Sequence, residues 1–112
     1  MNTVAVGYAR RSKKSDEKTV SLEEQAGKIR AYALNHEITL ATIVVHDGVS
    51  GTKRVRFEDI EKAIALHEAK LLLVYHRDRL ARDVAGLMDL LRDFAQRGVT
   101  IREVTTGSLL TI

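Results

Sequence analysis

Short runs of apolar, mostly β-branched residues alternate along this chain with longer segments whose apolar residues recur every three or four positions. The apolar runs, which predict strands, are residues 3–8, 38–45, 71–75 and 99–104. The segments with helical periodicity are residues 22–35, 57–66 and 80–94. Strands separated by helices of about 10 to 16 residues form βαβ units. The sequence therefore predicts a three-layer α/β domain, with a mostly parallel sheet of at least four strands and helices on both faces.

Local signals predict where several of these elements begin and end. Ser21 and Glu24 have the Ser-x-x-Glu spacing of a capping box, so we expect the first helix to start directly after Ser21 and to run to about Asn35. Gly98 predicts the end of the third helix. The 112 residues contain no proline and no linker-like stretch, so we expect a single domain.

The composition excludes several kinds of site. The chain has no cysteine, which rules out disulfides, thiolate zinc sites and cysteine nucleophiles. Its four histidines include no i, i+4 pair, and neither glycine-rich motif of the nucleotide-binding folds is present. We therefore expect no metal and no cofactor. No apolar run approaches the roughly 18 residues of a membrane span, and no signal peptide is recognisable, so we expect no membrane partner and a cytoplasmic location.

Basic residues follow the first three predicted strands. In a doubly wound α/β fold, ligands bind beyond the carboxyl ends of the strands, where these residues would meet. Ten of the 18 basic residues of the chain are in these segments: Arg10, Arg11, Lys13, Lys14, Lys53, Arg54, Arg56, Arg77, Arg79 and Arg82. Seven of the ten are arginines, whose planar guanidinium suits bidentate phosphate contacts, so solvated loops explain the pattern poorly. The sequence predicts a phosphate-binding concavity, with the Ser12 hydroxyl beside it.

Five ordered blocks carry a resemblance to a known family. The blocks are Tyr8–Ser12, Ser21–Gln25, Asp47-x-x-Ser50-Gly51, Arg54-x-x-Phe57 and Asp78–Arg82. In this order and spacing they resemble the N-terminal catalytic domain of the serine recombinases, which include resolvases, invertases and serine integrases. The resemblance covers Val4 to about Gly107. It implies that residues 1–112 are one such catalytic domain, ending before the dimerisation helix and the C-terminal DNA-binding region of the family.

The resemblance also assigns roles to individual residues. It implies that Ser12 is the nucleophile and that Arg10, Arg79 and Arg82 are active-site arginines. A further arginine of the family corresponds to Arg54, or to Arg56 if the loop is aligned without a gap. Positions that line the same site correspond to Tyr8, Gln25, Asp47 and Ser50.

The role of Asp78 stays open between two possibilities. Its carboxyl group is either a general acid or base for Ser12, or a partner that orients Arg79 or Arg82.

The activity implied by the resemblance is site-specific DNA recombination without a metal. The Ser12 hydroxyl would attack a phosphodiester of double-stranded DNA, expel a 3′-hydroxyl and form a 5′-phosphoserine link, which the reverse reaction rejoins. The family forms homodimers, and tetramers at synapsis. The length of the stretch from Lys13 to Val20 favours an integrase or a transposon recombinase over a small resolvase.

Two other classes of function remain as alternatives. One is a noncatalytic α/β interaction domain, which does not require Ser12 beside converging arginines. The other is a phosphate-recognising nucleotide- or RNA-binding module, which would form no covalent intermediate. Covalent trapping of DNA on Ser12 discriminates among the three.

Overall fold

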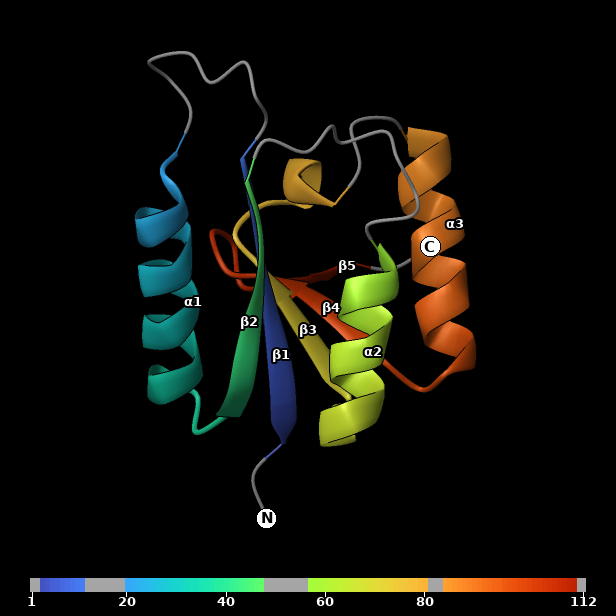
Figure 1. The fold of residues 1–112 in the computed structure, drawn as a ribbon, viewed down its shortest axis with the longest axis horizontal. Helices are drawn as coiled ribbons and strands as arrows, with labels where there is room; N and C mark the ends of the chain where they lie inside the picture. Colours follow the sequence, from blue (N-terminus) through green and yellow to red (C-terminus); the bar gives the residue numbers. More distant parts are fainter. Residues whose placement is uncertain (1–2, 12–19, 48–56, 81–83, 111–112) are drawn as a thin grey trace.

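The structure, a computed structural model, describes residues 3–11, 20–47, 57–80 and 84–110. Helices and strands alternate along these residues as the sequence predicts (Figure 1). In chain order they are β1 (Val4–Arg11), α1 (Leu22–Asn35), β2 (Thr39–Asp47), α2 (Phe57–His67), β3 (Leu71–Val74), the 3-10 turn η2 (Arg77–Arg79), α3 (Val84–Gln96), β4 (Thr100–Glu103) and β5 (Ser108–Leu110).

The five strands form one sheet in the order β2-β1-β3-β4-β5. The first four strands along the chain are parallel, and β5 is antiparallel to β4. Helix α1 covers one face of the sheet, and α2 and α3 cover the other (Figure 1). The prediction of a three-layer α/β domain with a mostly parallel sheet is confirmed. Strand β5 is an addition to the four predicted strands; it follows a turn at Gly107, whose φ of 74° favours glycine.

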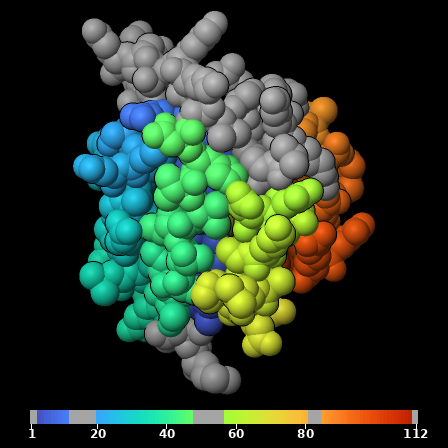
Figure 2. Space-filling view, in the orientation of Figure 1, coloured from blue at the N-terminus to red at the C-terminus, as the bar shows by residue number. Residues whose placement is uncertain are grey.

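Each face of the sheet has its own apolar core, because side chains alternate between the two faces along a strand. On the face covered by α2 and α3 the core includes Val6, Tyr8, Ile60, Leu72 and Phe94. On the α1 face it is smaller and includes Ala5, Ile29, Ala33, Leu71 and Leu73. Strand β2 is the edge of the sheet, and Figure 2 shows it at the surface between α1 and α2.

Two strands run further than the sequence predicts. Strand β1 ends at Arg11, three residues beyond its predicted end, and β2 ends at Asp47, two residues beyond. The pairing of the two strands continues through Arg10 with His46 and through Arg11 with Asp47. These polar residues stay in the sheet because their side chains form hydrogen bonds there, as those of Arg10 and Arg11 do. A prediction based on apolar runs cannot detect this extension of the strands. Arg10 and Arg11 are therefore strand residues, and not loop residues as expected.

The helix predictions are confirmed with one correction. Ser21 caps α1, since its side chain accepts a hydrogen bond of 3.0 Å from the backbone N–H of Glu24. Gly98 has a φ of 74° just after α3 ends, as expected of a residue that terminates a helix. The third helix, however, begins at Val84 and not at Leu80. Leu80 is buried in the core but caps the separate turn η2, so its apolar character reflects burial and not α-helical structure.

Candidate active site

Arg10 is buried at the carboxyl edge of the sheet. Only 2% of its surface is exposed. Its guanidinium lies against η2, the short turn that follows β3: Nε donates to the carbonyl of Arg79 at 2.8 Å, and Nη2 donates to the carbonyl of Asp78 at 3.0 Å. Two segments almost 70 residues apart in sequence are thus joined at one point, as the phosphate-site prediction requires.

Gln25 binds the backbone of Arg10. Its side chain is fully buried in the first turn of α1; the amide oxygen accepts from the Arg10 N–H at 3.2 Å, and the amide nitrogen donates to the Arg10 carbonyl at 3.0 Å. The amide nitrogen also donates to the carbonyl of Val20 at 3.1 Å. Pairing of β1 with β3 ends at Tyr8, so Gln25 bonds the stretch of β1 that continues beyond it. Gln25 is therefore adjacent to Arg10, and it positions the main chain of Arg10.

Arg79 contacts both the strand and its own neighbour in η2. Its Nη1 donates to the carbonyl of Arg10 at 3.2 Å, while Nε and Nη2 donate to the two carboxylate oxygens of Asp78 at 3.0 and 3.2 Å. Arg10 and Arg79 thus bind each other's backbone carbonyls. The two parallel hydrogen bonds to Asp78 orient the guanidinium of Arg79, and 18% of the Arg79 side chain is exposed.

The carboxyl group of Asp78 is ionised at neutral pH. Partial burial raises its pKa, but the hydrogen bonds and charge of Arg79, together with nearby His76, more than offset this and hold the pKa below its ordinary value of 3.8. A carboxylate with a lowered pKa is a weak base. The geometry therefore favours the orienting role of Asp78 over the acid or base role.

Tyr8 belongs to a second chain of hydrogen bonds on the same face of the sheet. Its hydroxyl lies 3.0 Å from Nδ1 of His46, and Nε2 of His46 lies 2.8 Å from the carboxylate of Asp59 in the first turn of α2. Neither His46 nor Asp59 is identified by the sequence as a site residue. The sequence does not predict this arrangement, because a single histidine next to an expected loop has no recognisable motif. The contacts of His46 depend on the continuation of β2 through His46 to Asp47.

Asp47 is at the same edge but pairs with a different residue. Both its carboxylate oxygens accept from the guanidinium of Arg11, each at 3.0 Å. Because successive residues of β1 point to opposite faces, Arg11 projects towards the α1 face while Arg10 projects towards α2 and α3. Within the described residues, Asp47 therefore belongs to a pair on the other face, and not to the Arg10 cluster.

The remaining predicted site residues lie outside the described residues. They are Ser12, Ser50, Arg54, its alternative Arg56, and Arg82. The structure thus brings together Arg10, Gln25, Asp78 and Arg79, and the site role of every one of the predicted residues stays a prediction. Ser12 follows the last residue of β1 directly in sequence.

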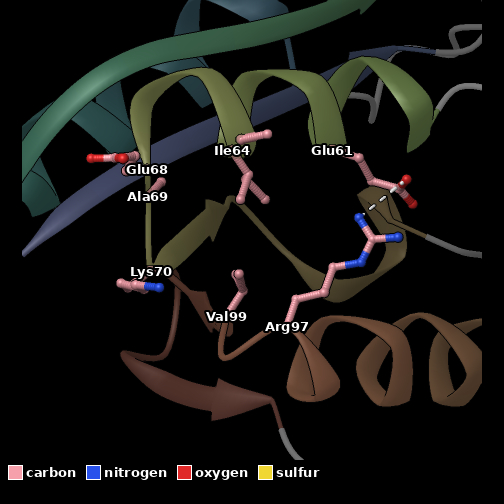
Figure 3. Close-up of a pocket in the computed structure, with 8 residues that line it drawn as sticks. Glu61, Ile64, Glu68, Ala69, Lys70, Arg97 and Val99 are labelled. Atoms are coloured by element: carbon pink, nitrogen blue, oxygen red, sulfur yellow. Dashed lines mark ion pairs between the residues drawn. The ribbon is translucent and has the colours of Figure 1, made fainter.

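A hollow at the amino ends of the strands, opposite to the carboxyl ends where Arg10 lies, is separate from this cluster. It lies between the ends of α2 and α3, near the starts of β3 and β4, with Ile64 and Val99 among its lining residues (Figure 3). An ion pair of 3.4 Å joins Glu61 and Arg97 at its rim. The described residues hold no group of three potential metal ligands and no helix long and apolar enough to cross a membrane.

Comparison with known families shows the family to which this chain belongs. The family model described as "Resolvase, N terminal domain" matches residues 5–111. The chain belongs to the resolvase family. A resolvase/recombinase of Pseudomonas putida is 33% identical over 102 residues, which are 90% of this chain and 51% of the relative. The transposon Tn3 resolvase of Escherichia coli is 30% identical over 101 residues, which are 90% of this chain and 50% of the relative.

Solved structures share the fold of this resolvase-family domain. The N-terminal catalytic domain of TP901-1 integrase superposes with a TM-score of 0.82 at 23% identity, covering 96% of this chain and 81% of the other. The C-terminal catalytic domain of ISC1926 TnpA, an IS607-like serine recombinase, gives a TM-score of 0.75 at 26% identity, covering 90% and 67%. The resolvase-family domain spans about half the length of the curated relatives named above.

Proposed function

We propose that this resolvase-family domain cleaves and rejoins double-stranded DNA through a phosphoserine formed on Ser12. In the cleavage step, a bond forms between the Ser12 oxygen and the phosphorus while the bond from phosphorus to the 3′-oxygen breaks. The serine loses its proton, the 3′-oxygen leaves as a hydroxyl, and the 5′-phosphate stays on the protein. The reverse reaction restores the DNA backbone without an external energy source, because the phosphoserine conserves the bond energy.

The observation that carries this proposal is that Arg10 and Arg79 each bind the backbone carbonyl of the other at the carboxyl ends of the strands. Arg10 is two residues before Ser12 in sequence. Negative charge grows on the phosphate oxygens as phosphorus becomes five-coordinate, and fixed guanidinium groups stabilise this charge. One charge pair at about 4 Å is worth on the order of 4 kcal/mol at an effective dielectric constant near 20. Only the part that is stronger in the transition state accelerates cleavage. Arginine supplies this stabilisation as a permanent cation, so the chemistry we propose needs no metal.

We assign supporting roles to the other predicted site residues. Asp78 orients Arg79, Gln25 fixes the Arg10 backbone, Arg54 and Arg82 add positive charge, and Ser50 lies at the margin of the site. Asp47 acts only indirectly, through its pair with Arg11 next to Ser12 in sequence. The partner is double-stranded DNA, bound in the full-length protein by a homodimer that pairs into a synaptic tetramer. We place this reaction in the cytoplasm.

Covalent trapping of DNA tests the proposal. The chain, fused to a DNA-binding module of known site, is incubated with a duplex that has a nick beside the expected cleavage point, so that the cleaved strand diffuses away and religation fails. We expect a protein–DNA adduct whose tryptic peptide carries the phosphate on Ser12. The variant Ser12→Ala is the control and should give no adduct.

The outcomes separate the alternative functions. DNA binding by the unfused chain with no adduct in the fusion would favour a nucleic-acid-binding module. An adduct on another residue would overturn the assignment of Ser12 as nucleophile.

A further inference from the structure

Glu103 is a fully buried carboxylate outside the predicted site. It is the last residue of β4, and its side chain has no exposed surface. Among the described residues its oxygens accept four hydrogen bonds: from the backbone N–H of Arg77 at 2.8 Å, from Nε and Nη2 of Arg77 at 3.1 and 3.2 Å, and from the hydroxyl of Thr106 at 2.9 Å. A ring nitrogen of His76 lies 3.6 Å away. A buried charge needs such a set of partners, since an unpaired one is costly.

The contacts of Glu103 converge on the start of η2. Arg77 is the first residue of this turn, and its backbone N–H is bonded directly to the carboxylate. The next two residues of the turn supply the carbonyl oxygens that hold the guanidinium of Arg10. Hydrogen bonds at both ends of η2, joined by the backbone of the turn itself, therefore connect β4 to β1. Because η2 has only three residues, a displacement of its first residue shifts the two carbonyl groups that follow.

The negative charge of Glu103 matters to this contact. Burial raises the pKa of the carboxyl group, but hydrogen bonds from Arg77 and Thr106 and the nearby His76 outweigh burial and hold the pKa below its ordinary value. All the hydrogen bonds to it are donated by its partners. An amide at this position would turn an N–H₂ group towards one of these donors, so that at least one bond is lost.

We propose that Glu103 is a positioning residue, which holds η2 in the place from which the turn fixes the guanidinium of Arg10. The effect of Glu103 on DNA cleavage rests on the proposed function; its effect on the position of Arg10 does not. Both effects are measured separately.

Nuclear magnetic resonance of the Arg10 side chain tests the positioning role in the 112-residue chain. The Arg10 side chain is buried and its Nε–H is bonded to the carbonyl of Arg79, so it should give a resolved ¹⁵N-detected signal with slow hydrogen exchange. In Glu103→Gln we expect this signal to shift and its exchange to become at least tenfold faster. The matched control is Glu61→Gln, which removes the ion pair with Arg97 beside the hollow in Figure 3. This variant should leave the Arg10 signal unchanged.

A second variant keeps the test decisive if Glu103→Gln does not fold. Arg77→Ala removes a half-exposed side chain and with it two of the hydrogen bonds to Glu103, while the backbone N–H remains. We expect a smaller shift of the Arg10 signal in the same direction. An Arg10 signal that is unchanged in whichever of the two variants is folded would overturn the inference.

Cleavage by the DNA-binding fusion measures the second effect. Glu103→Gln should lower the single-turnover cleavage rate at least tenfold while the Kd for DNA stays unchanged, and Glu61→Gln should alter neither. A shifted Arg10 signal in a protein whose parent forms no adduct would contradict the proposed function and leave the positioning role intact. Normal cleavage by Glu103→Gln with an unshifted signal would contradict the positioning role alone.

Discussion

At the scale of single residues, the pairing of Asp78 with Arg79 determines what each can contribute. Two of the guanidinium nitrogens of Arg79 bind the carboxylate, and a third binds the Arg10 carbonyl. This use of three nitrogens in fixed directions is specific to arginine, because lysine has a single nitrogen. Asp78 keeps a lowered pKa through the same contacts, so its proton is absent at neutral pH.

An orienting role and an acid or base role of Asp78 predict different effects of Asp78→Asn on cleavage. Asparagine retains an oxygen that accepts from Arg79 but loses the charge, so we expect a rate about tenfold lower, which corresponds to the roughly 1.4 kcal/mol of one charge-assisted hydrogen bond. The shape of the pH–rate profile should stay the same. Arg79→Lys, measured in parallel, should lower the rate by about a hundredfold relative to the parent chain, because lysine cannot form the paired hydrogen bonds of the guanidinium. Disappearance of one limb of the profile in Asp78→Asn would instead identify Asp78 as the general acid or base.

The sequence identified Arg10, Asp78 and Arg79 as neighbours, and the structure joins them. This succeeded because the carboxyl ends of parallel strands meet at one edge whatever the details of the loops. Glu103 was not identified, because a glutamate at the end of a short strand looks like a solvated residue until its burial is known. The side chains of Arg10 and Arg79 each donate to the backbone carbonyl of the other residue, and no local sequence pattern predicts such a tertiary contact.

At the scale of elements, the order of helices and strands was predictable and some of their ends were not. Apolar periodicity reports which segments are buried, so it located β1, α1 and α2. It cannot report where a strand ends when charged residues continue the pairing, as Arg11 and Asp47 do. Nor can it separate η2 from α3, since Leu80 is as buried as a helical core residue.

The close packing of α1 on β1 leads to a prediction for two glycines. A Cβ atom on Gly7 would lie 2.9 Å from Ile29 and 3.0 Å from Ile43, so Gly7→Ala should destabilise the domain by about 1–3 kcal/mol. Gly27 lies within α1, where an added Cβ would meet no described atom within 4 Å beyond the backbone of the helix itself, so Gly27→Ala should stabilise by roughly 0.5–1 kcal/mol. Urea unfolding of both variants measures these changes. Equal effects of the two substitutions would contradict close packing at Gly7.

At the scale of the whole molecule, two lowered carboxyl pKa values make folding depend on pH. Asp78 and Glu103 bind protons less readily in the folded chain than in the unfolded chain. The unfolded state therefore takes up more protons as the pH falls, and their contribution to stability is present at neutral pH and lost in acid. For Glu103 the loss begins near the ordinary value of 4.5 and continues as the pH falls to the lower folded value.

The pH dependence predicts how Glu103→Gln compares with the parent chain. The variant should have a lower Tm at pH 7, because buried hydrogen bonds worth roughly 1–3 kcal/mol are disturbed. The difference in Tm should shrink as the pH falls from 5 to 3, about where the parent loses its carboxylate. Thermal unfolding followed by circular dichroism gives both values. A difference that stays constant over this range would show that the charge of Glu103 does not contribute to stability.

Among the contacts of the described residues, η2 binds the guanidinium of Arg10 through the main-chain carbonyls of residues 78 and 79. Replacing either side chain leaves those two oxygens in the polypeptide. Substitutions at Asp78 or Arg79 therefore change the side chains around the cation but keep its two carbonyl acceptors, whereas Arg77 also ties the turn to Glu103. Because the acceptors are main-chain atoms, positions 78 and 79 are the places in η2 where the charge of the candidate site can be varied by mutagenesis while these acceptors are kept.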